Sequence, residues 1–102
     1  MRLTNDQLFH IRQEVPRFFG VGSHVWLFGS RVDDQQRGGD IDLYIEPEIQ
    51  GASQLVDAKL SFLLKMHRIL GDQKIDVVLN RGKSGVSLPI YKIAKDTGEP
   101  LL

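Results

Sequence analysis

Three aspartates have the types and the spacing that could support catalysis. Asp40 and Asp42 stand one residue apart in a run of alternating polar and apolar residues, and Asp76 stands between apolar residues in 74–79. Because alternate side chains of a strand share a face, Asp40 and Asp42 are expected on one face about 7 Å apart. If Asp76 belongs to a neighbouring strand, three carboxylates converge. Either their pKa values then rise or a cation compensates their charge.

Such a cluster suits Mg²⁺, which is held by a few carboxylates, waters and substrate phosphates. Two ions about 4 Å apart would hold the attacking and leaving oxygens of a phosphoryl or nucleotidyl transfer. Gly29 and Ser30 supply a phosphate contact, because glycine lets a ligand approach the backbone and a helix beginning at Ser30 would direct N–H groups at it. Arg31 either adds a charge-assisted contact or is a solvated loop residue.

Each part also has a purely structural interpretation. A glycine–serine pair is usually a turn, and an Asp-x-Asp sequence is more often a solvated strand face than a pair of ligands. The combination favours a site, because a strand, the pair Gly29-Ser30, the acids Asp40 and Asp42 and the later Asp76 all occur in one order.

The apolar periodicity predicts the elements that would position these residues. A capping box at Thr4 begins a first helix, and Pro16 predicts a kink or an end of that helix near Glu14. Short β-branched and aromatic runs predict strands at 24–28, 40–46 and 74–79. A helix is expected at 52–70, before Gly71, and a last helix from Pro89 to about residue 96. The predicted order is α, β, β, α, β, α.

Two details of the apolar pattern bear on the surface of the protein. Trp26 lies in an apolar strand and is expected to pack in the core rather than to stack on a base. The helix at 52–70 is expected to pack on the sheet, and Phe62, Leu64 and Met66 could leave an apolar patch for a partner.

The composition limits the class of protein. A chain of 102 residues is expected to form a single domain, 1–102. Lys plus Arg and Asp plus Glu are both 13, and this zero net charge argues against a nucleic-acid partner. The absence of cysteine excludes disulfides and thiolate metal sites. Neither a signal peptide nor a membrane-spanning run is present, so a cytoplasmic protein without a membrane partner is expected.

Three blocks of the sequence resemble the minimal nucleotidyltransferases of the DNA polymerase β superfamily. The blocks are Gly29-Ser30-Arg31, Gly39-Asp40-Ile41-Asp42-Leu43 and Lys74-Ile75-Asp76-Val77-Val78, and the resemblance covers essentially the whole chain. It implies an α/β (α+β) fold with a small mixed three-stranded β-sheet and helices packed on it. It also implies Mg²⁺-dependent transfer of a nucleoside monophosphate from a nucleoside triphosphate.

The resemblance also implies a role for each residue of the site. Gly29 and Ser30, with Arg31 beside them, would bind the triphosphate of ATP. Asp40 and Asp42 would bind both metal ions. Asp76 would bind the catalytic metal and help to activate the acceptor hydroxyl. Gly39 departs from the pattern, because many members have a serine there, but this change does not touch a metal ligand.

Small proteins of this type resemble the antitoxins of toxin–antitoxin pairs whose toxin is a helical HEPN ribonuclease. The resemblance implies transfer of AMP from ATP to a tyrosine of that toxin. The chain is short for a helical region that closes over base and acceptor, so we expect a partner chain to supply that wall. The alternatives are an antitoxin that acts by occlusion without catalysis and a small-molecule nucleotidyltransferase. The acceptor, the preferred base and a homo-oligomeric state stay open.

Overall fold

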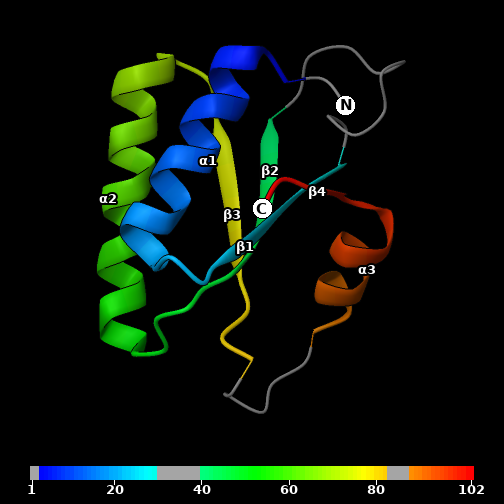
Figure 1. Cartoon of the computed structure of the whole chain (residues 1–102). Helices are drawn as coiled ribbons and strands as arrows, with labels where there is room; N and C mark the ends of the chain where they lie inside the picture. Colours follow the sequence, from blue (N-terminus) through cyan, green and yellow to red (C-terminus); the bar gives the residue numbers. More distant parts are fainter. Residues whose placement is uncertain (1–2, 30–39, 83–87) are drawn as a thin grey trace.

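The computed structural model of the chain describes residues 3–29, 40–82 and 88–102. Along the chain these residues form α1 (Asn5–Phe19), β1 (His24–Phe28), β2 (Ile41–Glu46), α2 (Ala52–Leu70), β3 (Ile75–Leu79), α3 (Pro89–Thr97) and β4 (Glu99–Pro100). The described part is therefore an α+β fold of three helices and a four-stranded mixed sheet (Figure 1). The six predicted elements occur in the predicted order, and β2 and β3 each begin one residue later than expected. Strand β4 follows them and was not predicted.

Helix α1 begins with the predicted capping box, in which the Thr4 hydroxyl accepts a hydrogen bond from the Gln7 N–H. The predicted helix end near Glu14 is wrong, since α1 continues through Pro16 to Phe19. A proline removes only one N–H from the helix. Burial of the last turn outweighs that loss, because Phe19 is fully buried with its ring 5.5 Å from that of Phe62.

The strands lie in the order β3-β2-β1-β4. Strand β2 is parallel to β3, and β1 is antiparallel to both β2 and β4. The predicted three-stranded sheet is therefore wrong by one strand. Strand β4 is too short to show a period in the sequence. It is held by its neighbour Leu101, which is buried and whose N–H donates to the Val25 carbonyl at 2.8 Å.

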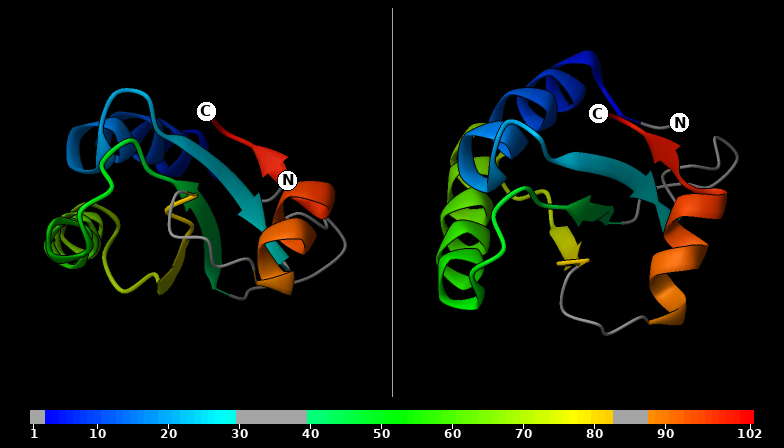
Figure 2. Two further views of the ribbon diagram at one scale, coloured as in Figure 1. Left: turned by 90° about the horizontal axis from the view of Figure 1, so that it is seen from below. Right: turned by 60° about the horizontal axis from the view of Figure 1, so that its bottom comes forward.

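The two faces of the sheet have different roles. Helices α1 and α2 cover one face and α3 lies on the other (Figure 2). The core between the sheet and the first two helices is made of the buried residues Ile11, Val15, Phe19, Val25, Leu27, Ile41, Leu43, Ile45, Leu55, Phe62, Met66 and Val77. The odd-numbered residues of β1 and β2 point into this core. The even-numbered residues, Asp42 among them, therefore point toward the α3 side.

The apolar patch expected at Phe62, Leu64 and Met66 is only partly present. Phe62 and Met66 are fully buried, and Leu64 alone of the three is exposed. The reason is the helical period, which places Phe62 and Met66 on the face toward the core and turns Leu64 away from it. Among the described residues, no helix is long and apolar enough to cross a membrane.

Candidate active site

Asp42 and Asp76 lie directly opposite each other on adjacent strands. The parallel register of β2 and β3 pairs Ile41 with Ile75 and Asp42 with Asp76. The Asp76 side chain is close enough to Asp42 to raise the pKa of the Asp42 carboxyl. The predicted convergence of Asp42 with Asp76 is therefore present, although 33 intervening residues separate them in the sequence.

The surroundings of Asp42 disfavour its negative charge. Burial raises the pKa of Asp42 above its ordinary value of 3.8, and the charges of Asp76 and Asp40 raise it further, as does the ability of a protonated Asp42 to donate to Asp76. Lys74 acts in the opposite direction and lowers the pKa. Burial and like charges therefore outweigh the compensation that Lys74 provides, and the neutral form of Asp42 is favoured relative to a solvated aspartate.

Gly29 closes the site from the end of β1. Its φ of +77° lies in the left-handed region, which glycine adopts without strain. A Cβ atom at this position would collide with the Oδ2 atom of Asp42, because Phe28 is the register partner of Asp42 and Gly29 follows it. The glycine therefore allows the backbone to lie against the Asp42 carboxylate. Ser30 and Arg31, the other predicted nucleotide contacts, lie outside the described residues.

Asp40 lies just before β2, near the acid pair, and forms an ion pair with Lys74. Its Oδ2 atom is 3.6 Å from the Lys74 Nζ atom. Within 3–29, 40–82 and 88–102, no three His, Cys, Asp or Glu side chains are arranged so that they could hold a metal ion. A site with all three predicted ligands would need the Asp40 carboxylate to leave Lys74.

Lys74 was not predicted as part of the site. The signal was available in the sequence, because Asp40-Ile41-Asp42 and Lys74-Ile75-Asp76 have the same spacing. The register that aligns Asp42 with Asp76 also brings Lys74 level with Asp40. Only knowledge of the parallel register turns this repeated spacing into an ion pair.

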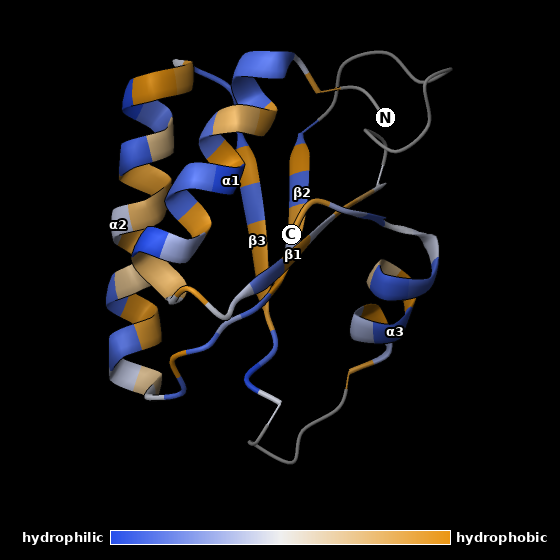
Figure 3. Ribbon diagram, in the orientation of Figure 1, coloured by the Kyte–Doolittle hydropathy of each residue, from blue (hydrophilic) through white to orange (hydrophobic). Residues whose placement is uncertain are grey.

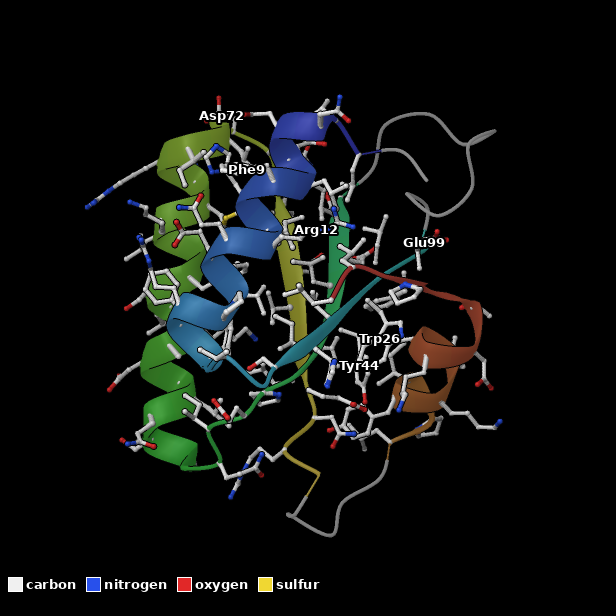
Figure 4. All side chains as sticks on the ribbon, in the orientation of Figure 1. Phe9, Arg12, Trp26, Tyr44, Asp72 and Glu99 are labelled. Carbon is white, nitrogen blue, oxygen red and sulfur yellow. The ribbon has the colours of Figure 1, made fainter. Side chains whose placement is uncertain are left out.

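Next to the acid pair, the sheet carries an aromatic cluster made of Trp26, Tyr44 and Tyr91. The Trp26 and Tyr44 rings are 5.3 Å apart, and the Tyr44 and Tyr91 rings are 5.8 Å apart. Lys95 of α3 places its Nζ atom 5.1 Å from the centre of the Trp26 ring and 3.2 Å from Glu46. Figure 4 shows Trp26 and Tyr44 between the sheet and α3. The prediction that Trp26 packs in the core is therefore wrong, because Trp26 is half-buried and lies on the face opposite the main core.

The Tyr44 hydroxyl is held from both sides. It donates to the Glu46 Oε2 atom at 2.7 Å and accepts from the Asn80 Nδ2 atom at 2.9 Å. Burial is the largest of the causes that raise the pKa of Tyr44 to about 12. The sequence did not single out this network, because its members come from β2 and from the residue after β3.

We expect Tyr44→Phe to lower the free energy of unfolding by about 1–2 kcal/mol, because Asn80 and Glu46 lose their common partner in a buried place. The folded state holds the phenolic proton more tightly than the unfolded chain does. Wild-type stability should therefore fall as the pH rises from 10 toward 12, and this fall should be smaller in Tyr44→Phe. Denaturant titrations across this range measure both effects. Tyr91→Phe is the matched control, and an equal loss there would contradict the assignment.

Two hollows lie at the other end of β2 and β3. One, of about 320 Å³, is lined by Ala52, Leu55, Val56, Lys59, Leu79 and Arg81. The other, of about 330 Å³, is lined by Gly22, His24, Glu46, Pro47, Gln50, Asn80, Arg81 and Gly82. Neither is lined by Asp42 or Asp76, which lie at the start of their strands. Arg81, whose Nε atom donates to the Gln50 carbonyl, is thus far from the carboxylates and is not placed to guide a phosphate to them.

No protein-family model matches the chain, and no curated protein matches it significantly.

Proposed function

We propose that this protein is a Mg²⁺-dependent nucleotidyltransferase with a polymerase β-like fold, which transfers AMP from ATP to a hydroxyl acceptor. The observation that carries the proposal is the in-register pair of Asp42 and Asp76, with the Gly29 backbone against it. Two carboxylates and a close backbone approach are what a metal–triphosphate complex needs. The resemblance of the three sequence blocks supports the same reaction.

The acid pair Asp42 and Asp76 supports the proposal of a divalent cation, and a third ligand requires Asp40 to leave Lys74. Burial and the neighbouring charges of Asp76 and Asp40 raise the pKa of Asp42, and a cation at this carboxylate would relieve the same unfavourable negative charge. Asp40, Asp42 and Asp76 would hold Mg²⁺, with two ions expected, and the metal would neutralise charge on the phosphates. Binding should therefore release protons and weaken as the pH falls.

The residues of the chain then have distinct tasks in the transfer. Gly29 and Ser30, with Arg31, would hold the triphosphate of ATP at the end of β1. The acceptor oxygen forms a bond to the α-phosphorus, and the bond from that phosphorus to pyrophosphate breaks. The acceptor proton passes to a carboxylate, a role for which Asp76 is suited because it is exposed while Asp42 is partly covered.

For the acceptor we propose a tyrosine of a HEPN-type toxin, with this chain as the antitoxin. The support is the resemblance together with the open position of the carboxylates, which are not in either hollow. A protein acceptor can complete an open site with its own surface. A small-molecule acceptor would need a concave site of its own.

A binding module that occludes its partner without catalysis is the second candidate. It is favoured by one observation, the ion pair that keeps the Asp40 carboxylate at Lys74 while the described acids form no three-ligand group. Under this alternative, Asp40→Asn combined with Asp42→Asn would still neutralise the toxin in cells. Under the catalytic proposal, protection is lost.

The direct test uses ATP labelled either on the α-phosphate or on the γ-phosphate, with Mg²⁺ and the product of the neighbouring gene. Label from the α position alone should appear on that protein, which separates nucleotidyl from phosphoryl transfer. Asp76→Asn should abolish it, and Asp72→Asn is the control, an exposed aspartate four residues away. No binding of ATP with Mg²⁺ in calorimetry, together with no transferred label, would overturn the proposal. Label on an aminoglycoside would instead favour the small-molecule alternative.

A further inference from the structure

Helix α2 carries an outward apolar stripe, which we define as Val56, Leu60 and Leu64. Their exposed fractions are 60%, 58% and 62%. The spacing of four residues keeps them on one side of the helix. The buried residues of α2, Leu55, Ala58, Phe62 and Met66, occupy the opposite side. In Figure 3 hydrophobic segments recur along the whole of α2, which lies at the outer edge of the molecule.

Within the part of the chain that the structure describes, none of the three stripe residues belongs to the hydrophobic core or packs against it. A surface helix normally turns charged and polar residues outward. Here three large apolar side chains lie outward along two turns, and Val56 also lines the hollow of about 320 Å³ between α2 and the end of β3. Contiguous exposed apolar surface of this kind marks an interaction site.

The charges beside the stripe indicate what the partner is. Asp57 and Arg68 are eleven residues apart, about three turns, so they lie on the same flank of α2 at opposite ends of the stripe. Among the described residues, neither has an ion-pair partner within the chain. An acid at one end and a base at the other complement a copy of the same helix that runs in the opposite direction.

We propose that two copies of this chain form a dimer through antiparallel packing of α2 on α2. A two-fold axis between Leu60 and Leu64 would pack Leu60 of each copy against Leu64 of the other. This two-fold axis lies in the plane of contact between the two helices, so a flank of one helix faces the same flank of the other. Asp57 of each copy therefore lies opposite Arg68 of the other. Each apolar and each charged contact then occurs twice.

Two further properties fit a second copy. The net charge of zero gives two copies no mutual repulsion. Helix α2 covers one face of the sheet (Figure 2). The alternation of β2 and the register with β3 turn Asp42 and Asp76 toward the other face, so the dimer leaves them accessible. The dimer is therefore independent of the proposed transfer reaction and would hold even if that reaction were disproved.

The size of the stripe sets the expected affinity. Helix α2 has 19 residues and is roughly 28 Å long. Three partly exposed side chains fall short of the roughly 800 Å² that each partner buries in a standard interface, even with the rim of the hollow added. We therefore expect a dissociation constant in the micromolar range rather than the nanomolar range.

Sedimentation equilibrium from about 1 μM to about 1 mM tests the proposal, since this range spans a micromolar equilibrium. The mass should rise from the 11.5 kDa of the monomer toward twice that value. Leu60→Glu should weaken the dimer at least about 100-fold, because the lost contact counts twice. Val21→Glu is the matched control, since Val21 is 87% exposed and lies outside α2, and it should leave the dimer unchanged.

A charge exchange tests the antiparallel register. Asp57→Arg alone should weaken the dimer about tenfold, and so should Arg68→Asp alone. The double variant Asp57→Arg/Arg68→Asp should restore it to within about threefold of wild type, because the pair is recreated with its signs exchanged. All these positions are exposed, so the circular dichroism and melting temperature of each variant should stay near those of the wild type.

Three results would overturn the proposal. The first is a chain that stays monomeric at the top of the concentration range, which would leave the stripe to a different protein. The second is a dimer that Leu60→Glu does not weaken. The third is a double charge variant that associates no better than either single variant.

Discussion

Replacing Asp42 with asparagine is expected to abolish nucleotidyl transfer while raising the melting temperature. The activity should fall at least about 100-fold, since the metal-bound charge at a phosphate is worth several kcal/mol and each 1.4 kcal/mol is about tenfold. Stability should rise by roughly 0.5 kcal/mol, because a carboxylate directly opposite Asp76 is replaced by an amide that can still donate to it. In a domain of this size that is about 2–4 °C.

The pH dependence identifies the cause of the added stability. The folded state binds the Asp42 proton more tightly than the unfolded chain does, in which the pKa of this carboxyl is near 3.8. The stability of the wild type therefore decreases as the pH rises through the window above 3.8. Asp42→Asn lacks this decrease. Its advantage should therefore be present at pH 7 and disappear toward pH 4.

Scanning calorimetry at pH 4 and pH 7 measures the melting temperature, and the label-transfer assay measures the activity. Asp72→Asn removes an exposed aspartate elsewhere and should change neither quantity. A variant that loses activity because it unfolds would show a lower melting temperature. A fall in both quantities would therefore contradict the assignment of Asp42 as a strained functional carboxylate.

Replacing Gly29 with alanine is expected to damage both stability and activity. At a φ of +77° a side chain costs about 1–2 kcal/mol. The added Cβ atom would also collide with the Asp42 carboxylate and displace it. A displacement of about 1 Å at a reacting group can lower the reaction rate about 100-fold, so we expect the rate of nucleotidyl transfer to fall by about that factor.

Gly71→Ala is a closely matched control for this prediction. Gly71 has the same φ of +77°, yet a Cβ atom there would meet nothing within 4 Å. In both variants a side chain at this φ should lower the free energy of unfolding, which denaturant titration measures. Only Gly29→Ala should lose more than that, and only Gly29→Ala should lose activity. Equal effects in the two variants would show that the contact with Asp42 has no functional role.

Much of the secondary structure follows from local patterns. The capping box at Thr4 correctly predicted the start of α1. The apolar period of 52–70 and the glycine after it predicted α2 with the bounds that the structure has. Pro16 misled the prediction, because the local cost of a proline was smaller than the gain from burying Phe19. Strand β4 was missed because two residues have no period.

The candidate site divides in the same way. The sequence by itself determined the residue types, the alternation that turns Asp42 toward one face, and a third aspartate in a later strand. Side-chain period and residue chemistry are local properties, so a single chain segment is enough to read them. The sequence did not determine that Asp76 would be the register partner of Asp42, nor that Lys74 would hold Asp40.

Those pairings were decided only by the tertiary structure. The crossover through α2 makes β2 and β3 parallel neighbours, and burial of the core fixes their register, since a slip of one residue would turn Asp42 into the core and Leu43 away from it. The same burial of Phe62 and Met66 leaves Leu60 and Leu64 outside. Register and exposure depend on contacts between residues distant in sequence, and for that reason the acid pair and the outward stripe of α2 became visible only in the folded chain.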